Sequence, residues 1–301
     1  MPLRFGLTAL EFQEVARKVI VDGIPDFSRL DVNNLIQETA SDGWSVLELS
    51  MDLKPIIPSS ITPESINRLI DLKEELGISY TIHLPYLSIE LATFNEHVRK
   101  GSVESIIEVI DLCKSLNPEA YVLHTTGDLA ADFSSLPYSP DIVRTISMLL
   151  AGFAATSIED IVSRTEINPR KLAIENYIFP FDVMRDVIDD QDTSICFDTA
   201  HLLCQMSGTE SIMDFYHTHK DRITEIHLQD GNFTKCGSVV DYNDHIPLGS
   251  GLMGDSVLRE FLLELVKDKF QGPIIFELTK DESKESLELI RRVVPEALTQ
   301  F

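Results

Sequence analysis

Short apolar runs of this 301-residue chain repeatedly end in a histidine or an acidic residue. In seven of eight such runs His, Glu or Asp stands at or near the C-terminal end. In a barrel of parallel strands these ends meet at one mouth, where such enzymes build their active sites. Imidazole and carboxylate groups gathered there suit divalent ions such as Zn, Mn, Fe or Co. The metal ligands that this pattern predicts are His83, His124, Glu175, Asp198, His201, His227 and Glu277.

One such residue alone predicts little. A lone histidine such as His83 is more often a satisfied structural residue, and a lone carboxylate such as Asp198 could cap the following helix. The joint pattern changes this interpretation, because several acids and histidines in a dry pocket would repel one another or stay unsatisfied unless cations bind them. Glu48 also stands in an apolar run, but no motif surrounds it, and its role is left open.

The apolar runs have the character of buried strands. They are short and rich in Ile, Leu, Val, Tyr and Phe, as strands covered on both faces should be. Helical patterns separate them, and the clearest begins at Thr62-Pro63 with an N-cap and a proline and stops at Gly77. Parallel strands need crossover helices, so the alternation predicts an α/β fold, a (β/α)8 barrel. The strand centres are expected near Phe5, Leu47, Ile82, Leu123, Ile174, Phe197, Ile226 and Ile275.

The composition indicates how many domains the chain forms and which class of partner it binds. No linker or change in composition divides the chain, so residues 1–301 are expected to form one domain. The chain has 25 basic and 49 acidic residues, a formal net charge of −24, and no run of three Lys or Arg. Since DNA-binding proteins neutralise phosphates with Lys and Arg, we expect a small-molecule substrate and no nucleic acid. The chain has no long apolar segment, no export signal and no CxxC motif. We therefore expect a cytoplasmic protein with no membrane span.

Several motifs together resemble the endonuclease IV branch of the xylose-isomerase-like barrel superfamily. Each is weak alone, but their number and order, spread over most of the chain, make the resemblance strong. It implies three zinc ions that activate water against a phosphodiester. The motifs are His83-Leu84-Pro85-Tyr86, Glu175-Asn176, Asp198-Thr199-Ala200-His201, His227-Leu228-Gln229-Asp230, His245 with Leu248-Gly249-Ser250-Gly251, and Glu277.

The resemblance also distributes the ligands among the ions. His83, His124 and Glu175 correspond to the ligands of a first metal. Glu175 is shared with a second metal, and His201 and His245 correspond to ligands of a third. The full second set is Glu175, Asp198, His227 and Glu277.

The third metal site departs from the family pattern. Endonuclease IV has an Asp two residues before the histidine that corresponds to His245, and this chain has Asn243 there. Asp241 and Asp244 lie close by in the sequence. Any of the three could complete the site, and a centre with two metals is the alternative.

Two reaction classes compete for this ligand set. Sugar isomerases and epimerases on the same barrel typically keep only the second set, around one Mn or Mg ion, with Glu175 and Glu277 transferring protons. The additional histidines favour hydrolysis with two or three Zn or Mn ions, because a phosphodiester needs help with both the nucleophile and the leaving oxygen. Glu175, bridging two ions, and Glu277, near the attacking hydroxide, are the predicted catalytic residues in that case.

Loops that follow the strands suggest the kind of substrate. Residues 54–58, 86–89 and 177–181 are rich in apolar side chains and would form an apolar rim, unless they pack on the outer helices. Gly249-Ser250-Gly251 could present backbone N–H groups to an anionic oxygen or could be a plain turn. An acidic chain with an apolar rim resembles the cobamide-remodelling phosphodiesterases, which act on a corrinoid nucleotide loop. We therefore predict a hydrolase of an organic phosphodiester, with a sugar isomerase or epimerase and an abasic-site endonuclease as alternatives.

Overall fold

Eight parallel strands close into a barrel in a computed structural model that describes residues 3–10, 12–134, 136–236 and 239–298. Around the barrel the strand order is β1-β12-β9-β8-β7-β6-β5-β4, so neighbours in sequence are neighbours in space. The predicted (β/α)8 barrel of a single domain is confirmed. The strands are β1 (Arg4–Ala9), β4 (Val46–Ser50), β5 (Ser79–His83), β6 (Tyr121–Leu123), β7 (Leu172–Glu175), β8 (Ser194–Asp198), β9 (Ile223–His227) and β12 (Pro273–Phe276).

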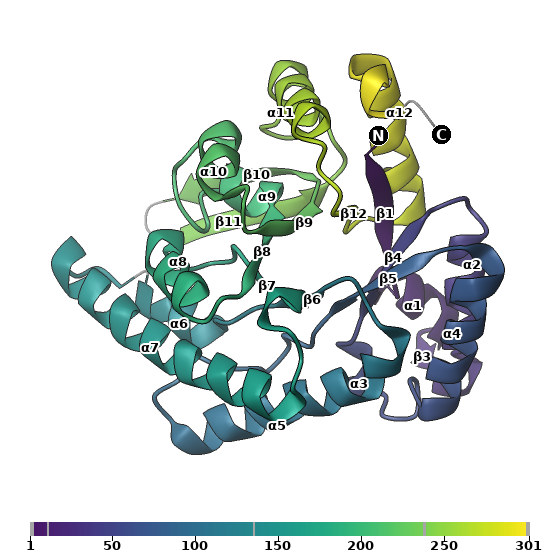
Figure 1. Cartoon of the computed structure of the whole chain (residues 1–301), viewed down its shortest axis with the longest axis horizontal. Helices are drawn as coiled ribbons and strands as arrows, with labels where there is room; N and C mark the ends of the chain where they lie inside the picture. Colours follow the sequence, from purple (N-terminus) through teal and green to yellow (C-terminus); the bar gives the residue numbers. More distant parts are fainter. Residues whose placement is uncertain (1–2, 11, 135, 237–238, 299–301) are drawn as a thin grey trace.

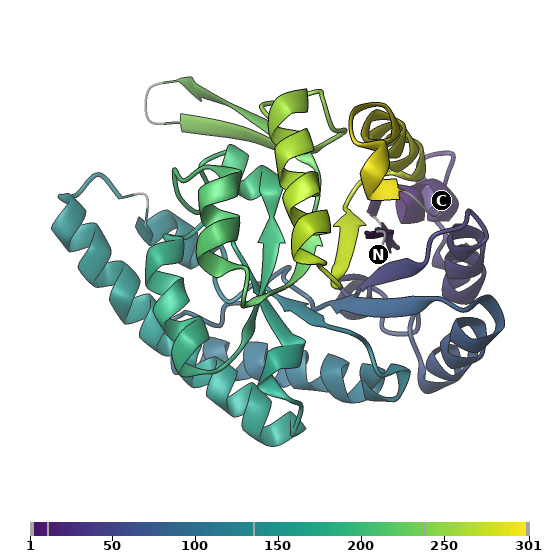
Figure 2. The same cartoon turned by 45° about the horizontal axis from the view of Figure 1, so that its top comes forward.

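Helices surround the barrel, as Figures 1 and 2 show. Their inward faces and the strands form one large apolar core, in which most strand residues are fully buried. The helices are α1 (Phe12–Val19), α2 (Val32–Ala40), α3 (Leu53–Ile56), α4 (Pro63–Leu76), α5 (Glu96–Cys113), α6 (Asp128–Ser134), α7 (Pro140–Thr165), α8 (Phe181–Asp190), α9 (Thr199–Leu203), α10 (Ile212–His219), α11 (Asp255–Asp268) and α12 (Lys280–Val293).

The boundaries of α4 follow directly from its sequence. The Thr62 hydroxyl accepts the backbone N–H of Ser65, and the Ser65 side chain accepts the N–H of Thr62 in return, which forms a capping box. Gly77 ends the helix with φ of 66°, in the left-handed region that suits glycine. The helix therefore begins and ends at the predicted residues.

In the described residues, two hairpins lie outside the barrel. A short one pairs β2 (Ile20–Val21) with β3 (Ile24–Pro25), and a longer one pairs β10 (Asp230–Cys236) with β11 (Val239–Ile246). The longer hairpin projects from the barrel in Figure 2. It carries His245 on an antiparallel strand, whereas the sequence interpretation placed all ligands at the ends of barrel strands or just after them.

Among the described helices, only α7 is long and apolar enough to cross a membrane by length and composition. Its buried face includes Leu150, Ala154, Ile158 and Ile161, and the helix packs against α5, α6 and α8. An outer helix of a barrel packs in this way.

Candidate metal centre

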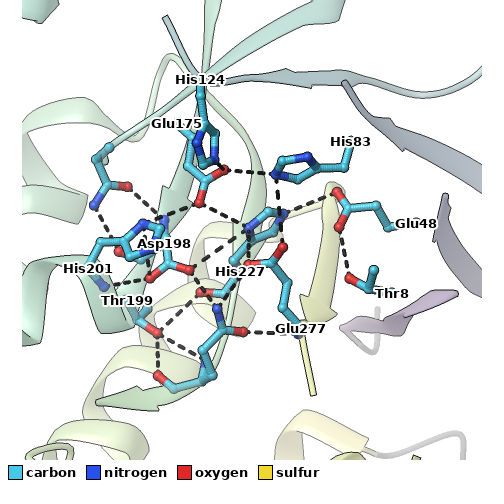
Figure 3. Close-up of polar contacts among 12 residues, drawn as sticks. Thr8, Glu48, His83, His124, Glu175, Asp198, Thr199, His201, His227 and Glu277 are labelled. Carbon is cyan, nitrogen blue, oxygen red and sulfur yellow. Dashed lines mark hydrogen bonds and ion pairs between the residues drawn. The ribbon is translucent and has the colours of Figure 1, made fainter. Parts of the chain in front are cut away.

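The predicted ligands converge at the C-terminal mouth of the barrel. Figure 3 labels all of them except His245. His83, Glu175, Asp198 and His227 are the last residues of β5, β7, β8 and β9. The others follow a strand or lie on added elements: His124 follows β6, Glu277 follows β12, His201 lies on α9 and His245 on β11. The polar atoms of each of three ligand sets lie within 4.8 Å of one another. The sets are His83, His124 and Glu175 (first set), Glu175, Asp198, His227 and Glu277 (second set), and Asp198, His201 and His245 (third set).

The first set is built around one carboxylate oxygen. Glu175 Oε2 lies 2.7 Å from His124 Nε2 and 3.4 Å from His83 Nε2. His83 Nδ1 lies 3.0 Å from the carbonyl oxygen of Leu84, so Nδ1 carries a hydrogen and Nε2 is the nitrogen that can bind a metal when the ring is neutral. The rings of Tyr86 and Tyr177 stack on His124, with centroids 4.9 and 4.6 Å away.

The second set shares Glu175 with the first. Glu175 Oε1 lies 3.4 Å from His227 Nδ1, so the two oxygens of Glu175 face different groups of ligands. His227 Nδ1 also lies 3.0 Å from Glu277 Oε2 and 3.9 Å from Asp198 Oδ2. This arrangement is what a carboxylate that bridges two ions requires.

Next to the third set lies Asp244, which the sequence did not single out from Asp241 and Asn243. Asp244 Oδ2 lies 3.5 Å from His201 Nε2, and Asp244 Oδ1 lies 3.2 Å from His245 Nδ1. Asn243 pairs instead with Asn232, and Asp241 with Thr234, in the ladder of the hairpin. Asp244 is therefore the acidic residue that the fold places beside the two histidines.

Several polar atoms of the cluster are buried without a hydrogen bond, and they show whether the cluster fits a metal ion. His124 Nδ1, Glu175 Oε1, His227 Nδ1 and both ring nitrogens of His201 are buried without a hydrogen-bond partner. Such atoms are rare in folded proteins, because leaving a buried polar group unsatisfied is costly. Apart from His124 Nδ1, these atoms face oxygens or nitrogens of the cluster that are also electron-rich, so the donor set fits divalent cations.

The carboxylates of the cluster have opposite pKa shifts. Burial raises the pKa of Glu175, but His124 and His227 outweigh it and hold the pKa well below its usual range. His227 and His245 do the same for the pKa of Glu277, against burial. For Asp198, burial dominates over the nearby His201 and raises the pKa to about 6. Two carboxylates thus stay ionised in the metal-free protein.

The histidines respond to these charges. Burial lowers the pKa of His83, but Glu175 and other carboxylates outweigh it and raise the pKa to about 10. Burial likewise opposes Asp198 and Asp244 at His201, whose pKa is also raised to about 10. At His124 burial prevails, and the pKa is lowered. Protons on His83 and His201 therefore occupy the place that metal ions would take.

Two motif residues without a predicted role hold the ligands in place. Gln229 Nε2 donates to Asp198 Oδ2 at 2.6 Å and to Glu277 Oε2 at 3.1 Å, and Gln229 Oε1 accepts the Glu277 N–H. Asn176 makes two hydrogen bonds to the backbone of Asp198. Their positions directly after a strand-ending ligand or two residues beyond it were the signal in the sequence, because polar groups around a metal site orient its ligands.

The glycine loop has a structural role. The N–H groups of Gly249 and Gly251 donate to Asp230 Oδ2 at 3.0 and 2.9 Å, and that of Met253 donates to Asp230 Oδ1 at 2.8 Å. The N–H groups of Gly249 and Gly251 thus bind an internal carboxylate, so they are not open to an anionic oxygen of a substrate.

A cavity of about 560 Å³ opens beside the centre. Its wall includes His83, His245 and Glu277, and no Lys or Arg is among its lining residues in the described chain. Lys54, which follows β4, donates instead to the carbonyl oxygens of Pro58 and Ile61. The apolar part of the wall consists of Leu10, Leu53, Ile56, Tyr86, Leu87 and Leu278.

The predicted apolar rim is present only in part. Ile56, Tyr86 and Leu87 are exposed and line the cavity. Phe179 and Phe181 are buried in the core instead, and Phe181 packs against Phe215 on α10. Phe179 and Phe181 of this loop thus follow the alternative interpretation, in which the loop packs away from the mouth, whereas Tyr177 stacks on His124 at the metal centre.

Fold and site together define a parallel barrel with a mouth lined by histidines and carboxylates. The chain matches the xylose isomerase-like TIM barrel family over residues 36–293 and belongs to this family. It is 24% identical over 255 residues to a probable endonuclease 4 of Sulfurihydrogenibium sp., which covers 77% of this chain and 84% of that protein.

Solved structures share the whole fold with this chain. A D-tagatose 3-epimerase-like protein superposes with a TM-score of 0.70 at 17% identity, covering 99% of each chain. Endonuclease IV from Thermus thermophilus gives a TM-score of 0.66 at 18% identity, covering 98% of this chain and 100% of its own. At these identities the likeness establishes the fold, and both epimerases and endonucleases are among the neighbours.

Proposed function

We propose that this protein is a metal-dependent hydrolase that cleaves a phosphodiester bond in an organic molecule. The observation that carries the proposal is the first set, which adjoins the second through the shared carboxylate of Glu175. An isomerase of this fold needs the second set alone. His83 and His124 have a purpose when the reaction needs more than one ion.

The residues of the centre have distinct roles in this proposal. Divalent ions bound here, with Zn or Mn as candidates, would supply a nucleophile from water near neutral pH and stabilise the leaving oxygen. Glu175 would fix the separation of the first and second sets, because each of its oxygens faces one of them. Glu277 lines the cavity and would lie beside the attacking water.

The cavity supports a bulky and largely uncharged organic group on the substrate. Its wall combines apolar side chains with neutral polar ones such as Thr8, Gln13 and Ser50. Without Lys or Arg in this wall, only the metal centre would compensate the phosphate charge. A phosphodiester within a large neutral framework, such as the nucleotide loop of a cobamide, has this chemistry.

A sugar or sugar-phosphate isomerase or epimerase with one divalent ion is the second candidate. The second set contains two glutamates, Glu175 and Glu277, that could transfer a proton to and from a sugar carbon. The likeness over the full chain to a D-tagatose 3-epimerase-like structure favours this candidate. It leaves His83 and His124 without a role.

One experiment separates the two candidates. The zinc- or manganese-loaded protein is incubated in ¹⁸O-water with a cobamide or an aryl phosphodiester, and in deuterated water with ketoses. We expect one ¹⁸O atom in a phosphodiester product and no deuterium in the sugars. His83→Ala and His124→Ala should abolish the hydrolysis. Deuterium entry into a ketose that survives both substitutions would establish the isomerase instead.

A further inference from the structure

A second layer of polar residues lies inside the barrel next to the metal centre. Glu48 on β4 and Glu225 on β9 are both fully buried, and their oxygens lie within 4.8 Å of a His227 nitrogen and of each other. Figure 3 shows Glu48 on the side of His227 opposite to Glu175 and Asp198, with Thr8 beyond it. The sequence left Glu48 without a role.

The two nitrogens of His227 face different partners. Nδ1 points to Glu175 and Glu277, at 3.4 and 3.0 Å. Nε2 lies 3.2 Å from Glu48 Oε2. A neutral imidazole that donates a hydrogen from one nitrogen presents a lone pair at the other. A hydrogen bond from Nε2 to Glu48 therefore leaves Nδ1 free to bind a cation.

Glu48 is itself held in place. Its second oxygen, Oε1, accepts the Thr8 hydroxyl at 2.9 Å. The side chains of Glu48 and His227 are both inaccessible to solvent, so water does not screen the contact. Three strands, β1, β4 and β9, thus supply a chain of contacts that runs from Thr8 through Glu48 to His227.

We propose that Glu48 is a positioning residue that fixes the tautomer and the orientation of His227, so that Nδ1 binds the ion of the second set. Carboxylates that accept a hydrogen bond from a metal-binding histidine raise its basicity and typically strengthen metal binding by about 10- to 100-fold. The inference rests on the proposal that the second set binds a metal. It holds for a hydrolase and for an isomerase alike.

Glu225 offers a matched control in the same layer. It stands two residues before His227 on β9 and is equally buried, but His227 Nε2 hydrogen-bonds to Glu48. Glu225→Gln therefore leaves the hydrogen bond between Glu48 and His227 in place, whereas Glu48→Gln replaces the carboxylate that accepts it.

The test compares Glu48→Gln, Thr8→Val and Glu225→Gln with the wild-type full chain, using zinc alone as the probe. Zinc affinity is measured by competition with a chelator, and melting temperature reports folding. We expect Glu48→Gln to weaken zinc binding about 10- to 100-fold. Thr8→Val should weaken it less, and Glu225→Gln should leave it unchanged. If Glu48→Gln does not fold, Thr8→Val still tests the inference, because it removes only the hydrogen bond from the Thr8 hydroxyl that holds Glu48 in place.

A spectroscopic readout separates positioning from a merely structural role. In the zinc-loaded protein with ¹⁵N-labelled histidine, we expect a low-field Nε2 proton of His227 that shifts upfield in Glu48→Gln. Equal zinc affinity in all variants, or weaker binding with an unchanged Nε2 proton, would overturn the inference. If the wild-type chain bound no zinc, the proposed metal centre itself would fail, which is a different result.

Discussion

Glu175 contributes two oxygens that serve different neighbours. Oε2 contacts His83 at the end of β5 and His124 just after β6. Oε1 contacts His201 and His227 at 3.2 and 3.4 Å. A carboxylate can bridge two cations in this way only while it carries a full negative charge. The low pKa of Glu175 keeps it ionised in the metal-free protein.

Glu175→Gln is therefore expected to lower the metal content by at least one equivalent and to abolish turnover while the fold persists. The amide has nearly the same shape, but it cannot compensate two cations. Metal counting by plasma mass spectrometry and circular dichroism check both parts. Glu288→Gln, on an exposed residue of α12, is the control and should change neither. Unchanged metal content in Glu175→Gln would remove this residue from the centre.

Metal binding should release protons from His83 and His201. Their pKa values of about 10 mean that both are protonated in the metal-free protein at neutral pH, whereas a metal-binding histidine must be neutral. The metal affinity of the first set and that of the third set should therefore each rise about tenfold per pH unit as pH rises toward 10, because each set loses one of the two protons. Calorimetry in buffers of different ionisation enthalpy measures the release. A binding heat that does not depend on the buffer would contradict it.

The β10–β11 hairpin is the element that brings the third set together. It starts at Asp230 and ends at Ile246, so it carries Asp244 and His245 toward His201 on α9. The Asp230 carboxylate fastens the loop that follows the hairpin through the N–H groups of Gly249, Gly251 and Met253. The third set thus depends on a carboxylate that does not itself belong to it.

Asp230→Asn should reduce the third metal site selectively. The amide nitrogen cannot accept the loop N–H groups, and the loss of charge-assisted bonds costs about 3 kcal/mol of stability. We expect about one equivalent of metal to be lost, with the first and second sets retained, and a lower denaturant midpoint. Asp255→Asn, in the first turn of α11, serves as the control. If Asp230→Asn kept its full metal content, the hairpin would not need this anchor.

At the scale of the whole molecule, the negative net charge of the chain opposes the binding of nucleic acid. The net charge of −24 repels a polyanion, and the cavity wall has no Lys or Arg among the described residues to contact successive phosphates. Because the chain is similar to a probable endonuclease 4, its action on DNA has to be tested directly.

A DNA duplex with one abasic site should therefore be neither bound nor cut at physiological salt. Gel-shift and nicking assays with the zinc-loaded protein test both, and a duplex without the lesion is the control. At lower salt we expect at most weak binding that does not depend on the lesion, because salt changes only the screening of charges on the protein and the DNA. Catalytic nicking at the abasic site would make this protein a repair enzyme.

The sequence alone determined the barrel and most of the centre. Short buried runs and capped helices are local patterns, and the closure of parallel strands brings their C-terminal ends to one mouth. His83, Glu175, Asp198 and His227 are strand-ending residues, so their gathering could be predicted without a structure.

Only the tertiary structure decided which residues meet across the barrel and beside it. Glu48 contacts His227 although 179 positions separate them, because both point into the same closed interior. The choice of Asp244 over Asp241 and Asn243 depends on the register of a hairpin that the sequence did not predict. Gly249 and Gly251 donate to Asp230 because their N–H groups need an acceptor and the fold places this carboxylate nearest to them. Phe179 is buried in the core because the fold offers its apolar side chain a place away from water.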